Sequence, residues 1–362
     1  MKRKITVATF VVGLSILLLI APSAMAKSLV LNTALTYSSS LPILGETITY
    51  FSSKVKEVSD GQLIFKLFEP GKLVPAMEIL EAVSKGRIQA GYSNPGFSAG
   101  KLPAGPLFSS IPFGPEAPEF LAWMYHGNGM KLYQEMYDRA GYKVKVFIVN
   151  MVPPETAGWF ANEIKSIDDL KGLKIRFFGL GGQVMQKLGA AVALTSAGEI
   201  FPALEKGALD ATEFSMPLVD TRLGFSKICK YNYFPGWHQQ ATANEIIINK
   251  EVWEKKLTKS QRAIIETCAM ATVVNMLALG EASQAKVMKE NAEKHGVKNM
   301  YFSPQLISTF HKAWEEVVAE QAAKDPFFKK VYEDLQNFRK EYAYWAGYAF
   351  LPRESGAKPP QK

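Results

Sequence analysis

Three charged residues with aromatic neighbours are the strongest candidates for chemistry in this sequence. Arg176 lies in a mostly apolar run, Glu213 stands where a second apolar run ends, and Glu155 follows two prolines. A charged side chain in an apolar strand costs free energy unless a partner compensates it. Arg176 therefore has two interpretations. It pairs with an acid to stabilise the fold, or its planar guanidinium binds a ligand carboxylate through two hydrogen bonds.

Signals for other chemistries are weak. No two histidines stand at a metal-ligand spacing, and no Cys-x-x-Cys pair accompanies them. The run Gly179–Gly182 lacks the third glycine of a dinucleotide-binding fingerprint and the Lys-Ser/Thr of a phosphate loop. A tight turn between a strand and a helix explains this run more simply. A secreted hydrolase that uses Glu155 and Glu213 as an acid–base pair remains an alternative.

Two stretches with nearly the same pattern indicate how these residues are positioned. Glu78–Ala90 and Glu199–Ala211 each predict a short amphipathic helix that ends at Lys-Gly and leads into an apolar strand. Gly86 and Gly207 stand where a helix end needs a residue that tolerates positive φ. A helix–Gly–strand unit used twice, roughly 120 residues apart, predicts two similar α/β lobes. A cleft between two lobes is a common place for a small ligand, and chance similarity is the alternative.

The C-terminal third predicts long helices rather than a third lobe. Thr258 and Gln261 form a capping box before a helix that reaches roughly to Lys294. Ser303-Pro304 then begins helical periodicity that runs to about Ala349. Proline removes a backbone donor, so a kink or break is expected near Asp325-Pro326. Such helices can brace two lobes, or one can contact another subunit.

The N-terminus predicts export. Residues 2–4 are basic, residues 5–20 are apolar, and Ala24-Met25-Ala26 has the small-x-small pattern of a signal-peptidase site. The apolar stretch is shorter than the roughly 20 residues of a typical membrane span. A retained anchor is therefore the weaker alternative. We expect a mature periplasmic protein that begins at Lys27.

Charge and cysteine content limit the classes of partner. Residues 1–26 contain three basic residues and no acid, so their removal lowers the formal net charge from +8 to +5. The remaining excess is spread along the chain, which argues against nucleic acid as a partner. Cys229 and Cys268 are the two cysteines of the sequence, and both a disulfide and buried free thiols are compatible with their positions.

These observations divide the chain into segments. We predict a signal peptide at 1–26, a first lobe at 27–150 that is completed by chain returning from the C-terminal part, and a second lobe at 151–257. Helices at 258–350 brace both lobes and offer a dimer contact, and 351–362 form a disordered tail. The predicted fold class is α/β with two lobes and long bracing C-terminal helices.

Several motifs resemble the solute receptors of TRAP transporters, which are periplasmic binding proteins of ion-driven uptake systems. The motifs are Lys171–Arg176, Pro202–Gly207, Asp210–Glu213 and Tyr233–Trp237, together with Ala122-Trp123, Tyr125–Gly127 and Ala157–Phe160. The sequence is most similar to the 2-oxo-acid receptors, over nearly the whole mature chain. Together these motifs are specific, although each alone is weak.

The resemblance implies a type II-like periplasmic binding protein without catalytic activity, whose lobes close over a small 2-oxo or 2-hydroxy carboxylate. The family's carboxylate-binding arginine corresponds to Arg176. The predicted ligand-binding residues are Arg176, Glu155, Tyr92, Asn94 and Phe214. The expected partners are the organic acid, the TRAP membrane subunits, and a second copy of the chain through the terminal helix.

In 2-oxo-acid receptors a cation bridges protein and ligand, and the resemblance assigns its ligands too. Glu213 corresponds to the metal-binding glutamate, Phe214 supplies a backbone carbonyl, and Glu155 and Gln239 supply further oxygens. A glutamine and a glutamate have exchanged positions relative to the family pattern, and Phe214 replaces a tryptophan. Because the number of carboxylates is unchanged, a site for Na⁺ or Ca²⁺ is predicted.

A receptor of another transporter class, for an amino acid or another carboxylate, is the main alternative. An amino-acid receptor needs an acid placed for the ligand ammonium and free of metal.

Overall fold

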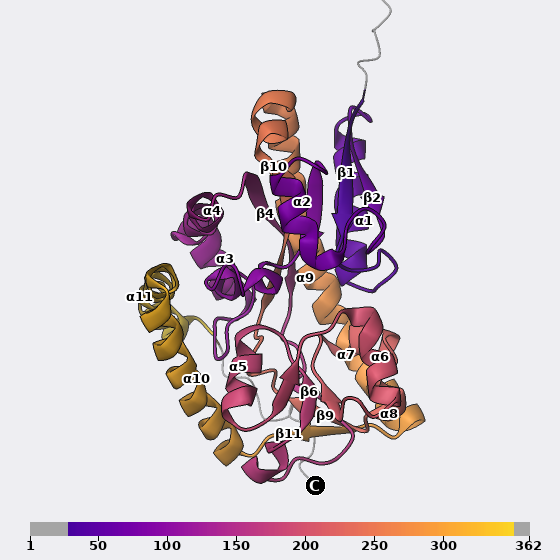
Figure 1. The fold of residues 1–362 in the computed structure, drawn as a ribbon, viewed down its shortest axis with the longest axis vertical. Helices are drawn as coiled ribbons and strands as arrows, with labels where there is room; N and C mark the ends of the chain where they lie inside the picture. Colours follow the sequence, from indigo (N-terminus) through magenta and orange to yellow (C-terminus); the bar gives the residue numbers. More distant parts are fainter. Residues whose placement is uncertain (1–27, 351–362) are drawn as a thin grey trace, which may run out of the picture.

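The computed structural model describes residues 28–350, so the predicted signal peptide and the predicted C-terminal tail lie outside the described residues. Figure 1 shows two α/β lobes along the long axis of the molecule, each built around its own sheet. The predicted two-lobed α/β fold is confirmed.

The first lobe contains a five-stranded sheet in the order β2-β1-β3-β10-β4. Its strands are β1 (Leu29–Leu35), β2 (Leu63–Phe68), β3 (Ala90–Ser93), β4 (Val144–Val152) and β10 (Thr242–Asn249). β1 pairs in parallel with β2 and β3, whereas β10 is antiparallel to both β3 and β4. β10 is buried along its whole length, because it lies between two neighbours and is covered on both faces.

The second lobe contains a six-stranded sheet in the order β11-β9-β5-β8-β6-β7. Its strands are β5 (Gly158–Phe160), β6 (Lys174–Arg176), β7 (Ala191–Ala193), β8 (Ala211–Thr212), β9 (Tyr231–Phe234) and β11 (Lys298–Tyr301). β6 pairs in parallel with β7 and β8, and β5 is antiparallel to β8 and β9. These strands are short, so most of the site residues lie in the loops that follow them.

Helices surround both sheets. The first lobe carries α1 (Leu44–Val58), η1 (Ala76–Glu78), α2 (Ile79–Ser84), η2 (Pro95–Ser98), η3 (Gly105–Phe108), α3 (Ala117–His126) and α4 (Gly129–Arg139). The second lobe carries η4 (Ile167–Leu170), α5 (Gly179–Lys187), α6 (Ala197–Glu205), α7 (Pro217–Arg222) and α8 (Phe225–Ile228). The C-terminal region adds η5 (Val252–Lys256), α9 (Lys259–His295), α10 (Pro304–Lys324) and α11 (Pro326–Ala349).

The chain passes between the lobes more than once. It enters the second lobe after β4 and returns through β10, which lies inside the range 151–257 that we predicted for the second lobe. α9 then leads back to β11 of the second sheet. Because the crossing segments lie side by side, a hinge between the lobes is confined to a few connections.

α9 braces both lobes, as predicted. It contacts β4 and α1 in the first lobe, and α7, α8 and β11 in the second. Among the described residues, it is the one helix long and apolar enough to cross a membrane by length and composition. Its buried residues Ile265, Val273 and Met276 instead place it against the core, and the core helices of soluble proteins pass the same test.

The repeated helix–Gly–strand pattern is confirmed, with one copy in each lobe. α2 ends before Gly86 and leads to β3, and α6 ends before Gly207 and leads to β8. Gly86 and Gly207 have φ values of +71° and +68°. Both glycines therefore supply the left-handed conformation that an L side chain rarely adopts.

The C-terminal helices also begin and end where the sequence predicts. Thr258 and Gln261 form the capping box of α9, and the Ser303 hydroxyl caps α10. Asp325 separates α10 from α11 and accepts hydrogen bonds from the backbone N–H groups of Phe327 and Phe328. α10 lies against α5 of the second lobe and α11 against α3 and α4 of the first, so this pair also joins the lobes (Figure 1).

One local expectation differs from the structure. Gly179–Gly182 form the first turn of α5 rather than a turn before it. A Cβ atom on Gly181 would lie 2.7 Å from the Phe177 ring and 2.9 Å from Cβ of His238. At Gly181, glycine therefore allows a close approach of α5 to the site loops.

Cys229 and Cys268 are free and buried, so of the two alternatives for the cysteines the structure has buried free thiols.

Candidate functional site

A closed cavity of about 20 Å³ lies between the two lobes. Its lining comes from the end of β1, from α1 and η2, from the start of β10, and from the loops after β3, β4, β6, β8 and β9. The lining residues are Tyr37, Leu44, Asn94, Phe97, Glu155, Arg176, Phe178, Phe214, Ser215, Gln239, Thr242 and Asn244. Strand ends that meet between two lobes are a usual place for a ligand site.

Arg176 and Glu213 form a buried ion pair in this cavity wall. Nη1 of Arg176 donates to Oε2 of Glu213 at 3.0 Å and to the Glu213 backbone carbonyl. The backbone N–H of Phe178 donates to the same Oε2 at 3.0 Å. Both side chains are at most 2% exposed. The pairing interpretation of Arg176 is therefore confirmed, but it uses only one edge of the guanidinium.

Glu155 and Gln239 come close to Glu213 from neighbouring loops. When the Gln239 amide nitrogen donates to Ser110 Oγ at 3.0 Å, its oxygen lies 2.8 Å from Glu213 Oε1 and 2.5 Å from Glu155 Oε2. Oxygens this close repel unless a cation lies among them. In the reversed orientation the amide nitrogen donates to both carboxylates instead. Two carboxylates and one amide group, which converge from three loops, include the oxygen ligands that a hard cation prefers.

The two glutamates differ in charge. Burial, together with the negative charges of Glu213 and Asp220, raises the pKa of Glu155 well above its ordinary value. Burial also acts to raise the pKa of Glu213, but the Arg176 charge and a hydrogen bond from His238 outweigh it and hold that pKa below its ordinary value. The Arg176 charge therefore favours the ionised form of Glu213, whereas burial and the neighbouring acids disfavour the ionised form of Glu155.

His238 is a site residue that the sequence analysis missed. Its Nε2 lies 3.4 Å from Glu213 Oε1, and its ring packs edge-on against Phe177 at 4.7 Å. Ligand atoms of Glu155, Glu213 and His238 all lie within 4.8 Å of one another. Metal-ligand spacing within the sequence does not reveal this group, because its three residues come from three separate loops. Its position next to Gln239 was the available signal.

Aromatic rings form the apolar walls. Phe214 lines the cavity, as predicted. The Arg176 guanidinium lies 5.0 Å from the centre of the Phe214 ring, so the ring stabilises the positive charge of Arg176. Tyr37 packs edge-on against Phe214 at 6.5 Å, and Phe97 packs edge-on against Phe178 at 5.1 Å. Both contacts join a residue of the first lobe to one of the second, so they form only when the lobes are closed.

The structure places Tyr92 behind the cavity rather than in its wall. Its hydroxyl donates to the carbonyl of Leu44 at 2.8 Å, and its ring supports Tyr37 edge-on at 5.8 Å. Side chains alternate along β3, so Tyr92 faces α1 and the core. We therefore assign Tyr37, not Tyr92, to the cavity. Asn94 does line the cavity, with its amide donating to the carbonyl of Ala243 at 3.1 Å and to Asn244.

Several polar atoms of the lining have no protein partner. Arg176 Nε, Ser215 Oγ and Asn244 Nδ2 are buried without a hydrogen bond among the described residues. Buried polar groups normally have partners, so such a group in a cavity wall indicates a ligand or water contact. Two of the three atoms are N–H donors and the third is a hydroxyl, which suits an oxygen-rich ligand such as a carboxylate.

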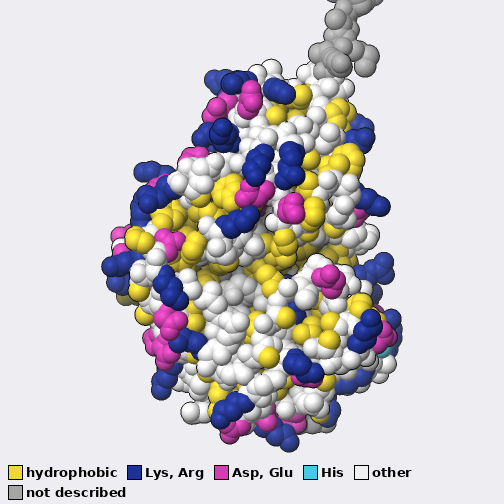
Figure 2. Space-filling model, viewed as in Figure 1, with side chains coloured by type: hydrophobic (Ala, Val, Ile, Leu, Met, Phe, Trp, Pro, Cys, Tyr) yellow, Lys and Arg dark blue, Asp and Glu magenta, His cyan; other side chains and the backbone are white. Residues whose placement is uncertain are grey.

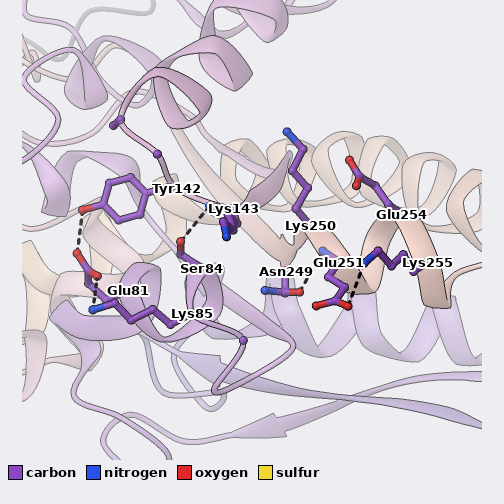
Figure 3. Close-up of a pocket in the computed structure, with 13 residues that line it drawn as sticks. Glu81, Ser84, Lys85, Tyr142, Lys143, Asn249, Lys250, Glu251, Glu254 and Lys255 are labelled. Atoms are coloured by element: carbon purple, nitrogen blue, oxygen red, sulfur yellow. Dashed lines mark hydrogen bonds and ion pairs between the residues drawn. The ribbon is translucent and has the colours of Figure 1, made fainter.

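A larger hollow of about 760 Å³ lies elsewhere in the first lobe, between α2, the end of α4 and η5 (Figure 3). Its charged side chains pair with one another, as in Lys85–Glu81 at 3.2 Å and Lys255–Glu251 at 3.3 Å. These pairs are largely exposed, and exposed pairs contribute little free energy. The hollow lacks the buried unpartnered groups of the smaller cavity, so we assign the ligand site to the latter.

The sequence also contains one pattern that is typical of a serine nucleophile. Gly96–Gly100 matches the G-x-S-x-G pattern of hydrolases, with Ser98 in the nucleophile position. Ser98 lies in the 3₁₀ turn η2 rather than on a strand-to-helix elbow, and no hydrogen bond to a histidine is found for its hydroxyl among residues 28–350. The geometry of a serine nucleophile is therefore absent from this turn.

The face of the molecule drawn in Figure 2 offers no charged patch that would compete with the cavity as a candidate site. Figure 2 shows Lys and Arg side chains interspersed with Asp and Glu over both lobes, and hydrophobic side chains near the waist between them. This face has no large patch of one charge.

Two lobes closed over a buried arginine, an acidic cluster and unpartnered donors define a solute receptor rather than an enzyme. The chain belongs to the bacterial extracellular solute-binding protein family 7, whose model matches residues 34–325. Within this family it is a receptor of the TRAP type, as the sequence analysis predicted.

Relatives with known ligands support this assignment. A monocarboxylate 2-oxoacid-binding periplasmic protein from a Nostoc species is 34% identical over 294 residues, covering 81% of this chain and 80% of that protein. A TRAP receptor from Pseudoalteromonas atlantica with bound sodium and pyruvate is 31% identical, with a TM-score of 0.85, and covers 89% of this chain and 97% of that one.

A third relative, from Bordetella bronchiseptica, holds copurified calcium and picolinate and is a mixed-occupancy dimer. It is 29% identical, with a TM-score of 0.86, and covers 89% of this chain and 95% of that one. The relatives are solute-binding receptors rather than enzymes, and they carry sodium or calcium together with carboxylate ligands.

Proposed function

We propose that this protein captures a small 2-oxo or 2-hydroxy monocarboxylate between its lobes for delivery to TRAP membrane subunits. The proposal rests on the surroundings of Arg176, which is 1% exposed. One edge of its guanidinium donates to Glu213, and its Nε has no hydrogen-bond partner in the cavity wall. A ligand carboxylate completes the hydrogen bonding of that guanidinium. Ser215 and Asn244 supply further polar contacts to its oxygens.

We also propose that Glu155, Glu213, Gln239 and the backbone carbonyl of Phe214 hold Na⁺ or Ca²⁺. The Gln239 amide lies within hydrogen-bond distance of both carboxylates, so the three side chains converge on one point, which supports this set. The cation supplies a positive charge that a 2-oxo acid can chelate through its carboxylate and its neighbouring oxygen. With Ca²⁺ and a monocarboxylate, the buried charges of Arg176, Glu155, Glu213, cation and ligand sum to zero, which limits the cost of burial.

An amino-acid receptor is the second candidate, because Glu155 is a buried acid without a basic side chain of its own. In that case Glu155 accepts the ligand ammonium and no metal is required. Dependence of binding on a cation therefore separates the two candidates.

We further infer that cleavage near Ala26 releases the receptor into the periplasm. The lobes then correspond to residues 27–150 with β10, and to residues 151–241 with β11, braced by α9 to α11. The two sheets and the contacts of α9 support this division.

We propose a homodimer through α11. Its first half is anchored to the first lobe of its own chain by Phe328, Val331 and Leu335, which are buried. Its second half exposes Tyr344, Trp345 and Tyr348, at 77%, 62% and 80%. Exposed aromatic side chains in one helical stretch are typical of a surface that contacts another protein.

Native mass spectrometry of the mature protein tests the proposed function. We expect a copurified organic acid and a cation, and, after refolding without ligand, binding of pyruvate in calcium-containing buffer. Absence of any acid, together with no heat on titration with pyruvate, lactate or an amino acid panel, would contradict it.

A further inference from the structure

The cavity wall limits which ligand tails fit, and this inference rests on the proposed function. Arg176 is the only lysine or arginine among the described residues that line the cavity. A second carboxylate on the ligand would therefore be buried without a positive partner, which costs several kcal/mol. The ligand tail must be uncharged. It faces the apolar side chains of the lining, Leu44, Phe97 and Phe178.

These apolar side chains leave little room. The cavity of about 20 Å³ holds roughly one water-sized sphere, so each carbon added to the ligand requires the walls to move further apart. Phe178 is 5% exposed and stands at the start of α5, two residues after Arg176. Phe97 is half-buried, in the short turn η2 of the opposite lobe.

The ring of Phe97 packs against two other aromatic rings. Its ring packs against Phe178 at 5.1 Å and against Tyr37 at 6.2 Å. The neighbouring Gly96 lies so close that a Cβ atom there would overlap the Phe178 ring. The turn that carries Phe97 therefore fits against Phe178 in the closed state without spare space.

We propose that Phe97, packed against Phe178 across the cleft, sets the length of the apolar ligand tail over which the lobes can close. A short tail leaves the Phe97–Phe178 contact intact. A longer tail displaces Phe97 and loses the aromatic contacts that close the lobes. Tail selection and lobe closure thus depend on the same side chain.

Calorimetric titration with straight-chain 2-oxo acids of three to six carbons tests this in the full mature protein with calcium present. The wild type should bind the three-carbon acid at least tenfold more tightly than the six-carbon acid. Each buried methylene normally favours binding by about fourfold. In Phe97→Ala that order should therefore flatten or reverse. Phe147→Ala, a remote phenylalanine packed 5.0 Å from Trp253, is the matched control and should keep the wild-type order.

Gly96→Ala tests closure. Its added methyl group would overlap the Phe178 ring, so the lobes should close less fully and all four acids should bind more weakly than they bind to the wild type. If Phe97→Ala is folded by circular dichroism and binds the acids in the wild-type order, the inference is wrong while the proposed function stands. If the wild type binds none of them, both are wrong.

Discussion

Arg176 has a structural role in its ion pair with Glu213, and we propose a binding role for the part of its guanidinium that Glu213 leaves unoccupied. Removing it would leave Glu213 buried without its positive partner, a change that destabilises proteins by about 3–5 kcal/mol. Arg176 variants therefore need a stability measurement beside every affinity.

We predict that Arg176→Ala weakens ligand binding by roughly 2–5 kcal/mol, because the buried ligand carboxylate loses its partner. Arg176→Lys should recover only part of this, since lysine keeps the charge for Glu213 but lacks the second donor edge. Calorimetry on variants shown to be folded by thermal unfolding measures both. Binding by Arg176→Ala within about threefold of wild type would place the carboxylate elsewhere.

Glu245 is a buried acid outside the cavity. It accepts hydrogen bonds from the hydroxyls of Tyr133 at 2.6 Å and Tyr137 at 2.8 Å. Burial raises its pKa from 4.5 to about 7, although the two tyrosines act to lower it. The folded state thus binds the Glu245 proton more tightly than the unfolded chain does.

This raised pKa makes stability depend on pH. The contribution of Glu245 is fully present below pH 4.5 and is lost as the pH rises through about 7. A shift of this size corresponds to about 3 kcal/mol. In denaturant titrations, Glu245→Gln should lose less stability than wild type between pH 5 and pH 8. Parallel pH profiles for the two proteins would contradict the assignment.

At the scale of elements, Gly207 tests why the repeated helix–Gly–strand unit contains glycine. Its φ is +68°, and no atom lies within 4 Å of an added Cβ. Gly207→Ala should therefore destabilise by about 1 kcal/mol, from the left-handed backbone alone. Gly198, in the first turn of the same helix α6, has equally open surroundings and no positive φ.

Gly198→Ala is the matched control and should be neutral or stabilising, by up to about 1 kcal/mol. Thermal and urea unfolding compare the two variants. Equal effects of both substitutions would show that the conformation of Gly207 does not matter.

The sequence predicts elements well where a local signal marks their ends. The capping residues Thr258 and Ser303, the break at Pro326 and the two Lys-Gly helix ends are all found where expected. These signals act within a few residues along the chain, so sequence alone contains them.

Contacts between residues far apart in the chain were harder to predict from the sequence. The central place of β10 in the first sheet depends on pairing with strands about 100 and 150 residues away. The tertiary fold brings His238 next to Glu213, and it places Tyr37 rather than Tyr92 in the cavity wall. Arg176 and Glu213 were predictable because their charges stand out in apolar runs.

At the scale of the whole molecule, the exposed end of α11 predicts self-association. Tyr344, Trp345 and Tyr348 would lose much of their exposed surface in a dimer. Sedimentation of the mature protein at micromolar concentration should show a dimer, and Trp345→Glu with Tyr348→Glu should produce a monomer that still binds ligand. A wild-type monomer at that concentration would contradict the dimer and leave the ligand site unaffected.

Glu155, Glu213 and Gln239 lie together in loops of the second lobe, and a cation held among them is the central claim about the ligand site. The most direct measurement is titration with pyruvate before and after exhaustive chelation and exchange into sodium-free buffer. We predict that affinity falls at least tenfold and recovers on addition of Ca²⁺ or Na⁺, and that Glu213→Gln loses more affinity than Gln239→Ala because it removes a charge from the cation. Unchanged affinity after chelation, with no metal found in the complex by elemental analysis, would contradict the account.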